Sequence, residues 1–157
     1  MRPSVDEVWM EVAIAISRRS RCSKAQVGAV VVSAEGRVES TGYNGPPAGL
    51  LVLEEQFSGA GCARFCERAR TGDQSKSYGI SCPSVHAEAN ALLYTDRSRI
   101  EGGTIYASRS CCADCAKLIA NSGIKRVVMR VLPEDAHRDP NEIAQFLQAC
   151  GLVVVPV

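Results

Sequence analysis

One histidine, one glutamate and two cysteines in the middle of this chain have the types and spacing of a metal-assisted acid–base site. His86 and Glu88 lie in the segment SVHAEANALLY, and Cys112 and Cys115 form a Cys-x-x-Cys pair further along. One imidazole and two thiolates supply three ligands to a zinc ion and leave a fourth position open. An open position is typical of catalytic zinc, whereas structural zinc has four protein ligands.

Glu88 follows His86 too closely to bind the same ion comfortably from one helical turn, but it can reach a water molecule beside that ion. Zinc in an open site lowers the pKa of a water molecule. Glu88 would take the proton from this water and deliver it to a ring nitrogen and then to a leaving amine. The four residues together therefore indicate hydrolytic deamination of an aminopyrimidine or aminopurine.

Two other interpretations of the four residues have to be weighed. The first is the polar start of a core helix together with a chance Cys-x-x-Cys, which is disfavoured because all four residues fit one mechanism. The second is a non-catalytic structural zinc module that recruits Cys111 or a remote cysteine as its fourth ligand. A structural site needs no acid–base group, so the presence of Glu88 favours the catalytic interpretation.

The elements that must position these residues follow from the hydrophobic pattern. Ser4 and Glu7 form a capping box before an amphipathic helix, and Ser84 is the predicted N-cap of the helix that carries Glu88. Further helices are predicted over residues 113–122 and 139–150, and strands over residues 26–33, 37–45, 102–108, 125–131 and 152–157.

The order of these elements predicts the fold class. The first two strands form an antiparallel hairpin, and the later alternation of strand and helix implies parallel strands. We therefore expect an α/β fold, a three-layer α/β/α sandwich with a mixed sheet of about five strands. Because the ends of neighbouring elements meet at one edge of such a sheet, His86 can share an ion with Cys112 and Cys115.

Composition limits the other functions open to the chain. Its 157 residues suit one domain, and 18 basic against 17 acidic residues argue against bulk binding to nucleic acid or membrane. No apolar run approaches the roughly 20 residues that span a bilayer, and the first residues lack the pattern of a secretory signal. We expect a cytosolic protein, in which eight cysteines favour metal binding or catalysis over disulfides.

A cysteine-rich insert at about residues 50–83 interrupts this single domain, residues 1–157. The insert is too long for an ordinary loop. It contains Cys62, Cys66 and Cys82, which could hold a second metal, with Cys22 or His137 as the fourth ligand. The alternative is three reduced thiols that pack as small hydrophobic side chains. Apart from these roles, Cys22 and Cys150 are predicted to be buried thiols and His137 an exposed histidine.

Five blocks of the sequence resemble the zinc-dependent cytidine/deoxycytidylate deaminase superfamily, and most closely its dCMP deaminases. They are SKAQVGAVVV, TGYNGPPAG, VHAEANALLY, GGTIYAS and CADCAKLIANSGIKRVV, which together cover about residues 5–130. The superfamily carries H-x-E and P-C-x-x-C signatures. This chain departs from them at Cys111, which replaces the proline, and at Ser108, where threonine is common.

The resemblance implies conversion of dCMP, or of a 5-substituted dCMP, to dUMP and ammonia, with one catalytic zinc. It also implies that the Ala87 backbone N–H contacts the pyrimidine carbonyl and that the Ser108 carbonyl contacts the exocyclic amine. Asn44 would contact the sugar or base, although its position in GYNG also suits a simple turn residue.

The size of the substrate and the regulation of activity depend on other parts of the sequence. Basic residues after the first helix, Arg21 and Lys24 among them, form either a solvated helix end or a phosphate site for a nucleotide. A deaminase of free nucleosides or bases would not need this cluster, and a deaminase of nucleic-acid bases would need a broader basic surface. GYNGPP resembles a segment that borders an effector site between subunits in dCMP deaminases. This implies a homo-oligomer, with a hexamer favoured, that responds to dCTP and dTTP.

Overall fold

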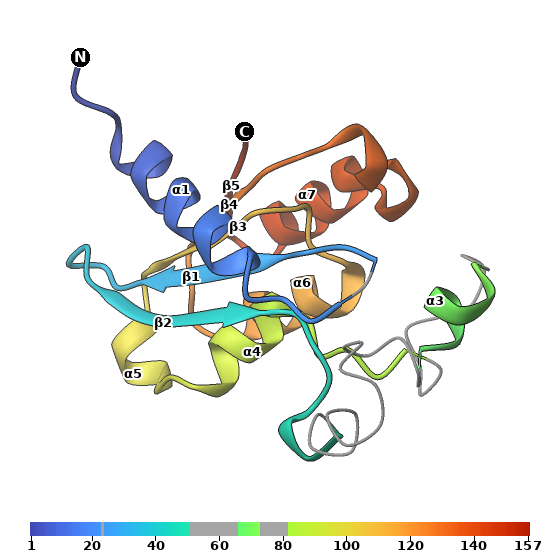
Figure 1. Ribbon diagram of the computed structural model, residues 1–157. Coiled ribbons are helices and arrows are strands. Elements are labelled where there is room, and N and C mark those ends of the chain that lie inside the picture. The colour runs from blue at the N-terminus through green and yellow to red at the C-terminus, as the bar shows by residue number, and fades with distance from the viewer. Residues whose placement is uncertain (23, 51–65, 73–81) are drawn as a thin grey trace.

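The structure is a computed structural model that describes residues 1–22, 24–50, 66–72 and 82–157. Its sheet has five strands in the order β2-β1-β3-β4-β5 (Figure 1). Strand β1 runs antiparallel to both β2 and β3, whereas β3, β4 and β5 are parallel. The strand bounds are β1 Gly28–Val32, β2 Val38–Tyr43, β3 Thr104–Ala107, β4 Arg126–Met129 and β5 Val153–Pro156. The predicted hairpin and mixed sheet are thus confirmed.

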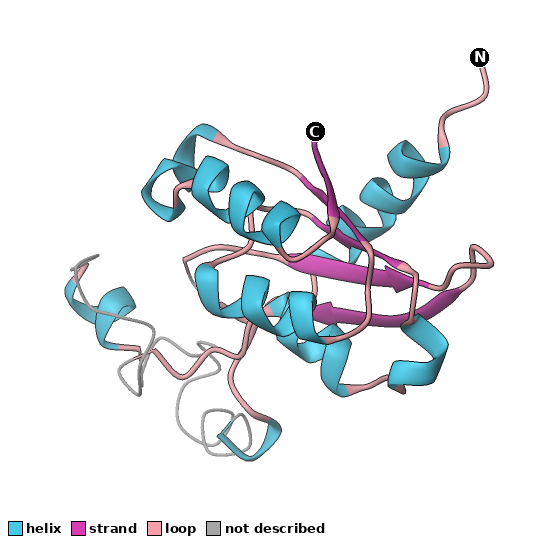
Figure 2. Cartoon of the chain, turned by 180° about the vertical axis from the view of Figure 1, so that it is seen from behind, coloured by secondary structure: helices cyan, strands magenta, loops and turns pink. Residues whose placement is uncertain are grey.

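Helices cover both faces of the sheet, which confirms the three-layer architecture. Helix α1 packs on one face, and α4, α6 and α7 pack on the other (Figure 2). The helical elements are α1 Val5–Ser17, α3 Glu67–Thr71, α4 Ala87–Leu93, α5 Arg97–Ile100, α6 Ala113–Asn121, the 3-10 helix η1 Pro133–Arg138, and α7 Pro140–Ala149. None of the helices in the described ranges combines the length and apolar character needed to cross a membrane.

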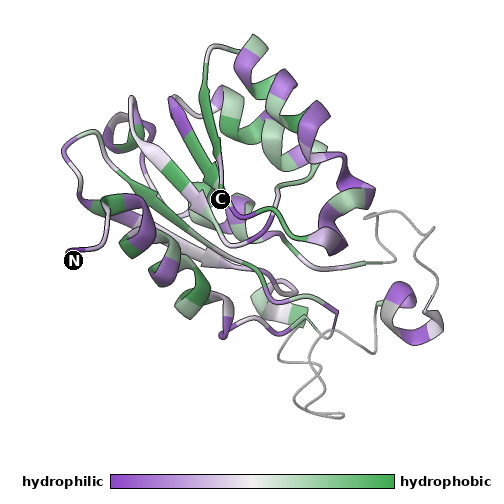
Figure 3. Cartoon of the chain, turned by 90° about the horizontal axis from the view of Figure 1, so that it is seen from above, coloured by the Kyte–Doolittle hydropathy of each residue, from purple (hydrophilic) through white to green (hydrophobic). Residues whose placement is uncertain are grey.

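Strand β1 is the centre of the core because both of its faces are buried. Successive side chains of a strand point to opposite faces, so Ala29 and Val31 contact the cluster under α4 and α6. Val30 and Val32 contact the cluster under α1. Viewed from above, the apolar colours gather on the strands and on the helical sides that face them (Figure 3).

Helix α1 begins with the predicted capping box, in which Ser4 and Glu7 bind each other's backbone N–H groups. A carboxylate in its first turn also ties the helix to the sheet. Asp6 accepts hydrogen bonds from the Tyr106 hydroxyl at 2.9 Å and from Arg126 Nη1 at 2.8 Å. The bond from Arg126 is the main reason that the pKa of Asp6 lies below its ordinary value.

Two local predictions were wrong. The N-cap of α4 is His86 and not Ser84. The reason is that Val85 exchanges two backbone hydrogen bonds with Gly45, which keeps the residues before His86 extended. Cys150 is exposed and not buried. It is the C-cap of α7, and the buried side of that helix consists of Ile143 and Leu147.

Gly42 lets α4 lie directly on β2, and we expect Gly42→Ala to lower both stability and activity. A Cβ atom at this position would lie 2.2 Å from the Ala87 carbonyl oxygen and 2.5 Å from the Ala91 nitrogen. Both atoms belong to the backbone of the helix that carries Glu88. Overpacking typically costs about 1–3 kcal/mol, and here the helix itself must move.

The matched control for this change is Gly49→Ala, because a Cβ at Gly49 would meet no heavy atom of the described residues within 4 Å. Thermal unfolding and steady-state rates of the two variants check the expectation. A Gly42→Ala protein with the melting temperature and kcat of Gly49→Ala would contradict the close packing of α4 on β2.

Candidate active site

Three predicted metal ligands meet where the first turns of α4 and α6 approach each other. The Nδ1 atom of His86 lies 3.3 Å from the Cys112 sulfur and 3.5 Å from the Cys115 sulfur. Tetrahedral zinc with bond lengths of about 2.0 Å to nitrogen and 2.3 Å to sulfur would separate such ligands by about 3.6 Å. In the described part of the chain, this is the one group of three such donors whose atoms all lie within 4.8 Å. The donor set therefore fits zinc.

The electrostatics of the two thiols also favours a cation between them. Cys112 is the N-cap of α6, and its sulfur accepts a hydrogen bond from the Cys115 N–H. Its contacts with the Cys115 thiol and with His86 lower the pKa of Cys112 to about 4. The same sulfur–sulfur contact raises the pKa of Cys115, because its thiol is hydrogen-bonded to the Cys112 sulfur, and burial adds to the shift. A divalent cation would stabilise both thiolates at once.

Cys111 directly precedes this pair but is not one of the three grouped donors. It is fully buried in the core, and burial raises the pKa of its thiol. The predicted choice of Cys112 over Cys111 as a ligand agrees with this placement.

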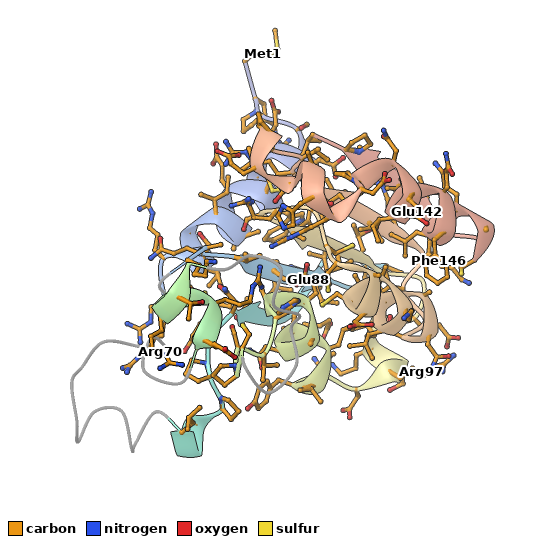
Figure 4. All side chains as sticks on the ribbon, turned by 90° about the vertical axis from the view of Figure 1, so that its right-hand side faces the viewer. Met1, Arg70, Glu88, Arg97, Glu142 and Phe146 are labelled. Atoms are coloured by element: carbon orange, nitrogen blue, oxygen red, sulfur yellow. The ribbon has the colours of Figure 1, made fainter. Side chains whose placement is uncertain are left out.

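Glu88 lies in the interior of the molecule (Figure 4), close enough to His86 and Cys112 to interact with their charges. It is 3% exposed, and burial is the main reason that its pKa is raised above the ordinary value. The nearby His86 and Arg138 oppose this shift. A raised pKa brings a carboxyl group closer to the working pH, which is the direction that a general acid–base needs.

A cavity of about 410 Å³ opens next to these residues, a volume within the usual range for small-molecule sites. His86, Ala87 and Glu88 form part of its wall. Four cationic side chains also line it, namely Lys24, Arg68, Arg109 and Arg138, against the two acidic residues Glu88 and Glu134. Even with Asp135, which pairs with Arg109, the described side chains carry more positive than negative charge, and this suits an anionic ligand.

Comparison with known proteins places this site in a family. A profile of the cytidine and deoxycytidylate deaminase zinc-binding region matches residues 3–131, which include all three metal donors and Glu88. The chain belongs to the cytidine and deoxycytidylate deaminase family.

Individual relatives agree with this assignment. The chain is 46% identical to the deoxycytidylate deaminase of Mycobacterium phage D29 over 128 residues, which are 81% of this chain and 94% of the phage protein. It is 36% identical to the deoxycytidylate deaminase of Saccharomyces cerevisiae over 155 residues, 98% of this chain but 45% of the yeast protein. The chain thus spans nearly the whole of the phage relative and about half of the yeast one.

A solved structure shows the same fold. It is the dCMP deaminase of cyanophage S-TIM5 in complex with dCMP and dUMP, which superposes with a TM-score of 0.69 at 29% identity. The superposition covers 100% of this chain and 99% of that one. A second match, Acinetobacter baumannii RibD, has 19% identity and a TM-score of 0.64 over 97% of this chain and 35% of its own. It supports the fold alone.

The other predicted substrate-binding residues of this deaminase are Ala87, Asn44 and Ser108, and each of them has different neighbours in the structure. Ala87 is buried against the cavity, and so is Asn44. The Asn44 carboxamide accepts from Val27 N at 2.8 Å and donates to the Ala25 carbonyl at 2.7 Å, so it also orders the entry to β1. Ser108 is buried at the end of β3, where its hydroxyl accepts from the Gly28 N–H. Their contacts with substrate remain predictions.

The two predicted phosphate ligands are separated in the structure. Lys24 lines the cavity of the deaminase, whereas Arg21 lines a second hollow with Tyr43, Pro46 and Tyr94. The reason is that residues 20–22 follow the end of α1 and pass Asn44, whose carbonyl accepts a bond from the Ser20 hydroxyl. Of the two, Lys24 is therefore the one placed to reach a substrate.

Three cysteines converge on the same cavity. Cys66 and Cys82 are buried, Cys22 packs against them, and all three line the cavity wall. The Cys82 thiol contacts Cys66, and burial is the main reason that its pKa is raised. The three sulfurs do not all lie within the 4.8 Å spacing met by the catalytic donors. Cys62, the other predicted ligand of a second metal, lies outside the described residues.

Arg109 and Arg138, which line the cavity together with Lys24, were not predicted from the sequence. Arg109 follows Ser108 in the loop that leads to Cys112, and Arg138 ends η1. His137 is exposed, as predicted, but it too lines the cavity. Both segments follow parallel strands, β3 and β4, whose carboxyl ends meet at one edge of the sheet. The sequence signal for the two arginines is therefore their position after parallel strands, the same signal that brings the metal ligands together.

Proposed function

We propose that this deaminase hydrolyses the 4-amino group of dCMP, or of a 5-substituted dCMP, to give dUMP and ammonia. The observation that carries the proposal is the buried Glu88 beside a three-donor zinc site, at the wall of a cavity with excess positive charge. The relatives named as deoxycytidylate deaminases, and the related structure that holds dCMP and dUMP, support the same substrate.

Each predicted site residue has a separate role in the reaction. His86, Cys112 and Cys115 would hold zinc, which when bound activates water for attack on the carbon that bears the amine. Glu88 takes one proton from the attacking water and passes it to the ring nitrogen. It then moves a second proton, from the hydroxyl group that the water has become, to the leaving amine. The Ala87 N–H and the Ser108 carbonyl orient the ring, and Asn44 contacts the sugar or base.

Charge distinguishes a nucleotide substrate from a free nucleoside or base. A 5′-phosphate in the cavity would gain charge-assisted hydrogen bonds of about 1.5–3 kcal/mol each. We therefore expect kcat/KM for dCMP to exceed that for deoxycytidine by one to two orders of magnitude. Equal values for the two substrates would contradict the phosphate site.

Lys24→Met should lower kcat/KM for dCMP by about tenfold and leave deoxycytidine nearly unchanged, since it removes one charge-assisted bond. Arg37→Met is a matched control, because Arg37 is exposed in the turn between β1 and β2. Arg21→Met tests the other predicted ligand, and its place in the second hollow leads us to expect a smaller effect than that of Lys24→Met.

We also propose a second, structural zinc held by the insert, with ligands drawn from Cys62, Cys66, Cys82 and either Cys22 or His137. The packing of Cys22, Cys66 and Cys82 supports this, because a metal that closes a long segment offsets its ordering entropy. Metal analysis of the purified protein should find two zinc ions per chain. Cys82→Ser should lose one of them, and the exposed Cys150→Ser should lose none. If the wild type, Cys82→Ser and Cys150→Ser each contained one zinc ion per chain, the thiols would be packing groups and not metal ligands.

Regulation is the last part of the proposal. We propose a homo-oligomer, favouring a hexamer, that dCTP activates and dTTP inhibits. The hollow formed by Arg21 and the GYNGPP segment, with Tyr43 and Tyr94 exposed beside it, supports a ligand or subunit contact there. Mass measurement in solution, and dCMP saturation curves with and without each triphosphate, test it. A hyperbolic curve that neither triphosphate changes would remove the regulatory part.

A further inference from the structure

We propose that Asp135 and Arg138 of η1 are positioning residues that hold the loop carrying the zinc ligand Cys112. The inference rests on the zinc site of the proposed function and goes beyond it by assigning a role to a segment that lies after the last metal ligand. The loop in question, residues 108–112, connects β3 to α6.

Asp135 is the centre of the contact. Its side chain is fully buried, and its carboxylate accepts from Arg109 Nε at 2.9 Å and from Arg109 Nη2 at 2.7 Å. The same carboxylate accepts from the Ser110 N–H at 3.3 Å and from the Leu132 N–H at 3.2 Å. One buried group thus joins η1 to both a side chain and the backbone of the ligand loop.

Arg138 completes the contact from the other end of η1. Its Nη1 atom donates to the Ser110 carbonyl at 2.6 Å, and its guanidinium lies 3.9 Å from Asp135 Oδ1. Both backbone polar groups of Ser110 are therefore bound by η1. Ser110 is itself fully buried and stands two residues before Cys112.

The physical consequence is a metal ligand whose backbone is ordered before the metal arrives. Residues 109–111 have no helical or strand ladder of their own, so other contacts must hold them. Fixing a residue's backbone costs about 1–2 kcal/mol. If η1 did not hold the loop, zinc binding would have to meet that cost, and affinity would fall. The same bonds fix Arg109 against the cavity wall.

The test compares two carboxylates that each bind an arginine. Asp135→Asn removes the negative charge that binds Arg109 and the Ser110 N–H of the ligand loop. Asp6→Asn removes the charge that ties α1 to Arg126 on the other face of the sheet, and so serves as the matched control. The measurements are the melting temperature, the zinc dissociation constant by chelator competition, and the midpoint of the zinc titration of activity.

We expect Asp135→Asn to weaken zinc binding by about tenfold or more, the usual effect of losing a group that supports a metal ligand. The midpoint of its activity titration should shift to higher zinc by the same factor. Asp6→Asn should lower the melting temperature but leave both zinc values within about twofold. A loss of stability by itself would change the fraction of the protein that is active. Loss of a positioning residue would instead shift the zinc concentration at the midpoint of the activity titration.

If Asp135→Asn does not fold, Arg138→Met carries the test, because it removes the bond to the Ser110 carbonyl and keeps the Arg109–Asp135 pair. We expect it to weaken zinc binding at least threefold. Wild-type zinc affinity in either variant, with the wild-type protein binding zinc and deaminating dCMP, would overturn this inference while leaving the proposed function intact. A wild-type protein that binds no zinc would instead refute the proposed function.

Discussion

Replacing Glu88 by glutamine is expected to lower kcat by more than about 10⁴-fold while the zinc stays bound. A general acid–base group typically contributes 10²–10⁴-fold. The larger effect is expected here because one carboxylate makes two transfers: one proton from water to the ring nitrogen, and a second from the new hydroxyl group to the leaving amine. Glutamine has nearly the same shape, so the buried position, 3% exposed, should still be filled without strain.

Zinc content and single-turnover rates, measured on one preparation, check this expectation. Asn90→Asp is a useful control, since Asn90 lies on the same helix but donates to the Tyr43 carbonyl at the sheet edge. It should alter stability more than the chemical step. A Glu88→Gln protein that kept more than about a tenth of the wild-type rate would refute the proposed mechanism.

Replacing Cys112 by alanine is expected to abolish both the catalytic zinc and the activity. Two ligands would remain at a site that needs three protein donors, and the Cys115 N–H would lose the sulfur that accepts its bond at the start of α6. Activity should fall to the level of the zinc-free wild-type protein. Adding zinc should restore the chelated wild type but not the variant.

The adjacent Cys111 supplies the matched control. It is fully buried but is not among the grouped donors. Cys111→Ala should therefore cost some stability through a small cavity and keep the zinc content and rate of the wild type. Loss of one zinc from Cys111→Ala, with zinc retained in Cys112→Ala, would mean that Cys111 is the ligand. The site would then have a different geometry.

Local patterns in the sequence, together with the family resemblance, were enough to predict the three donors that the structure groups. His86 and Glu88 at the start of a helix, and Cys112 and Cys115 one turn apart, have their relative positions determined by a few adjacent backbone angles. The same holds for the capping box of Ser4 and Glu7 and for the alternation of strands and helices that implies a mixed sheet. Within each pair the residues are close in the chain, so their spacing predicts the local geometry. The mixed sheet, and the meeting of His86 with Cys112, instead follow from the order of the strands and helices.

The tertiary structure decided which residues surround that group. Spacing could not show that Lys24 lines the cavity whereas Arg21 lines a different hollow. It also could not show that His86, and not Ser84, is the N-cap of α4 because Val85 pairs with Gly45. It could not show that Asp135 of η1 accepts a hydrogen bond from the backbone of the ligand loop. These contacts join segments far apart in the chain through loops without a repeating pattern. Their geometry depends on how the whole core packs, and no local sequence signal encodes it.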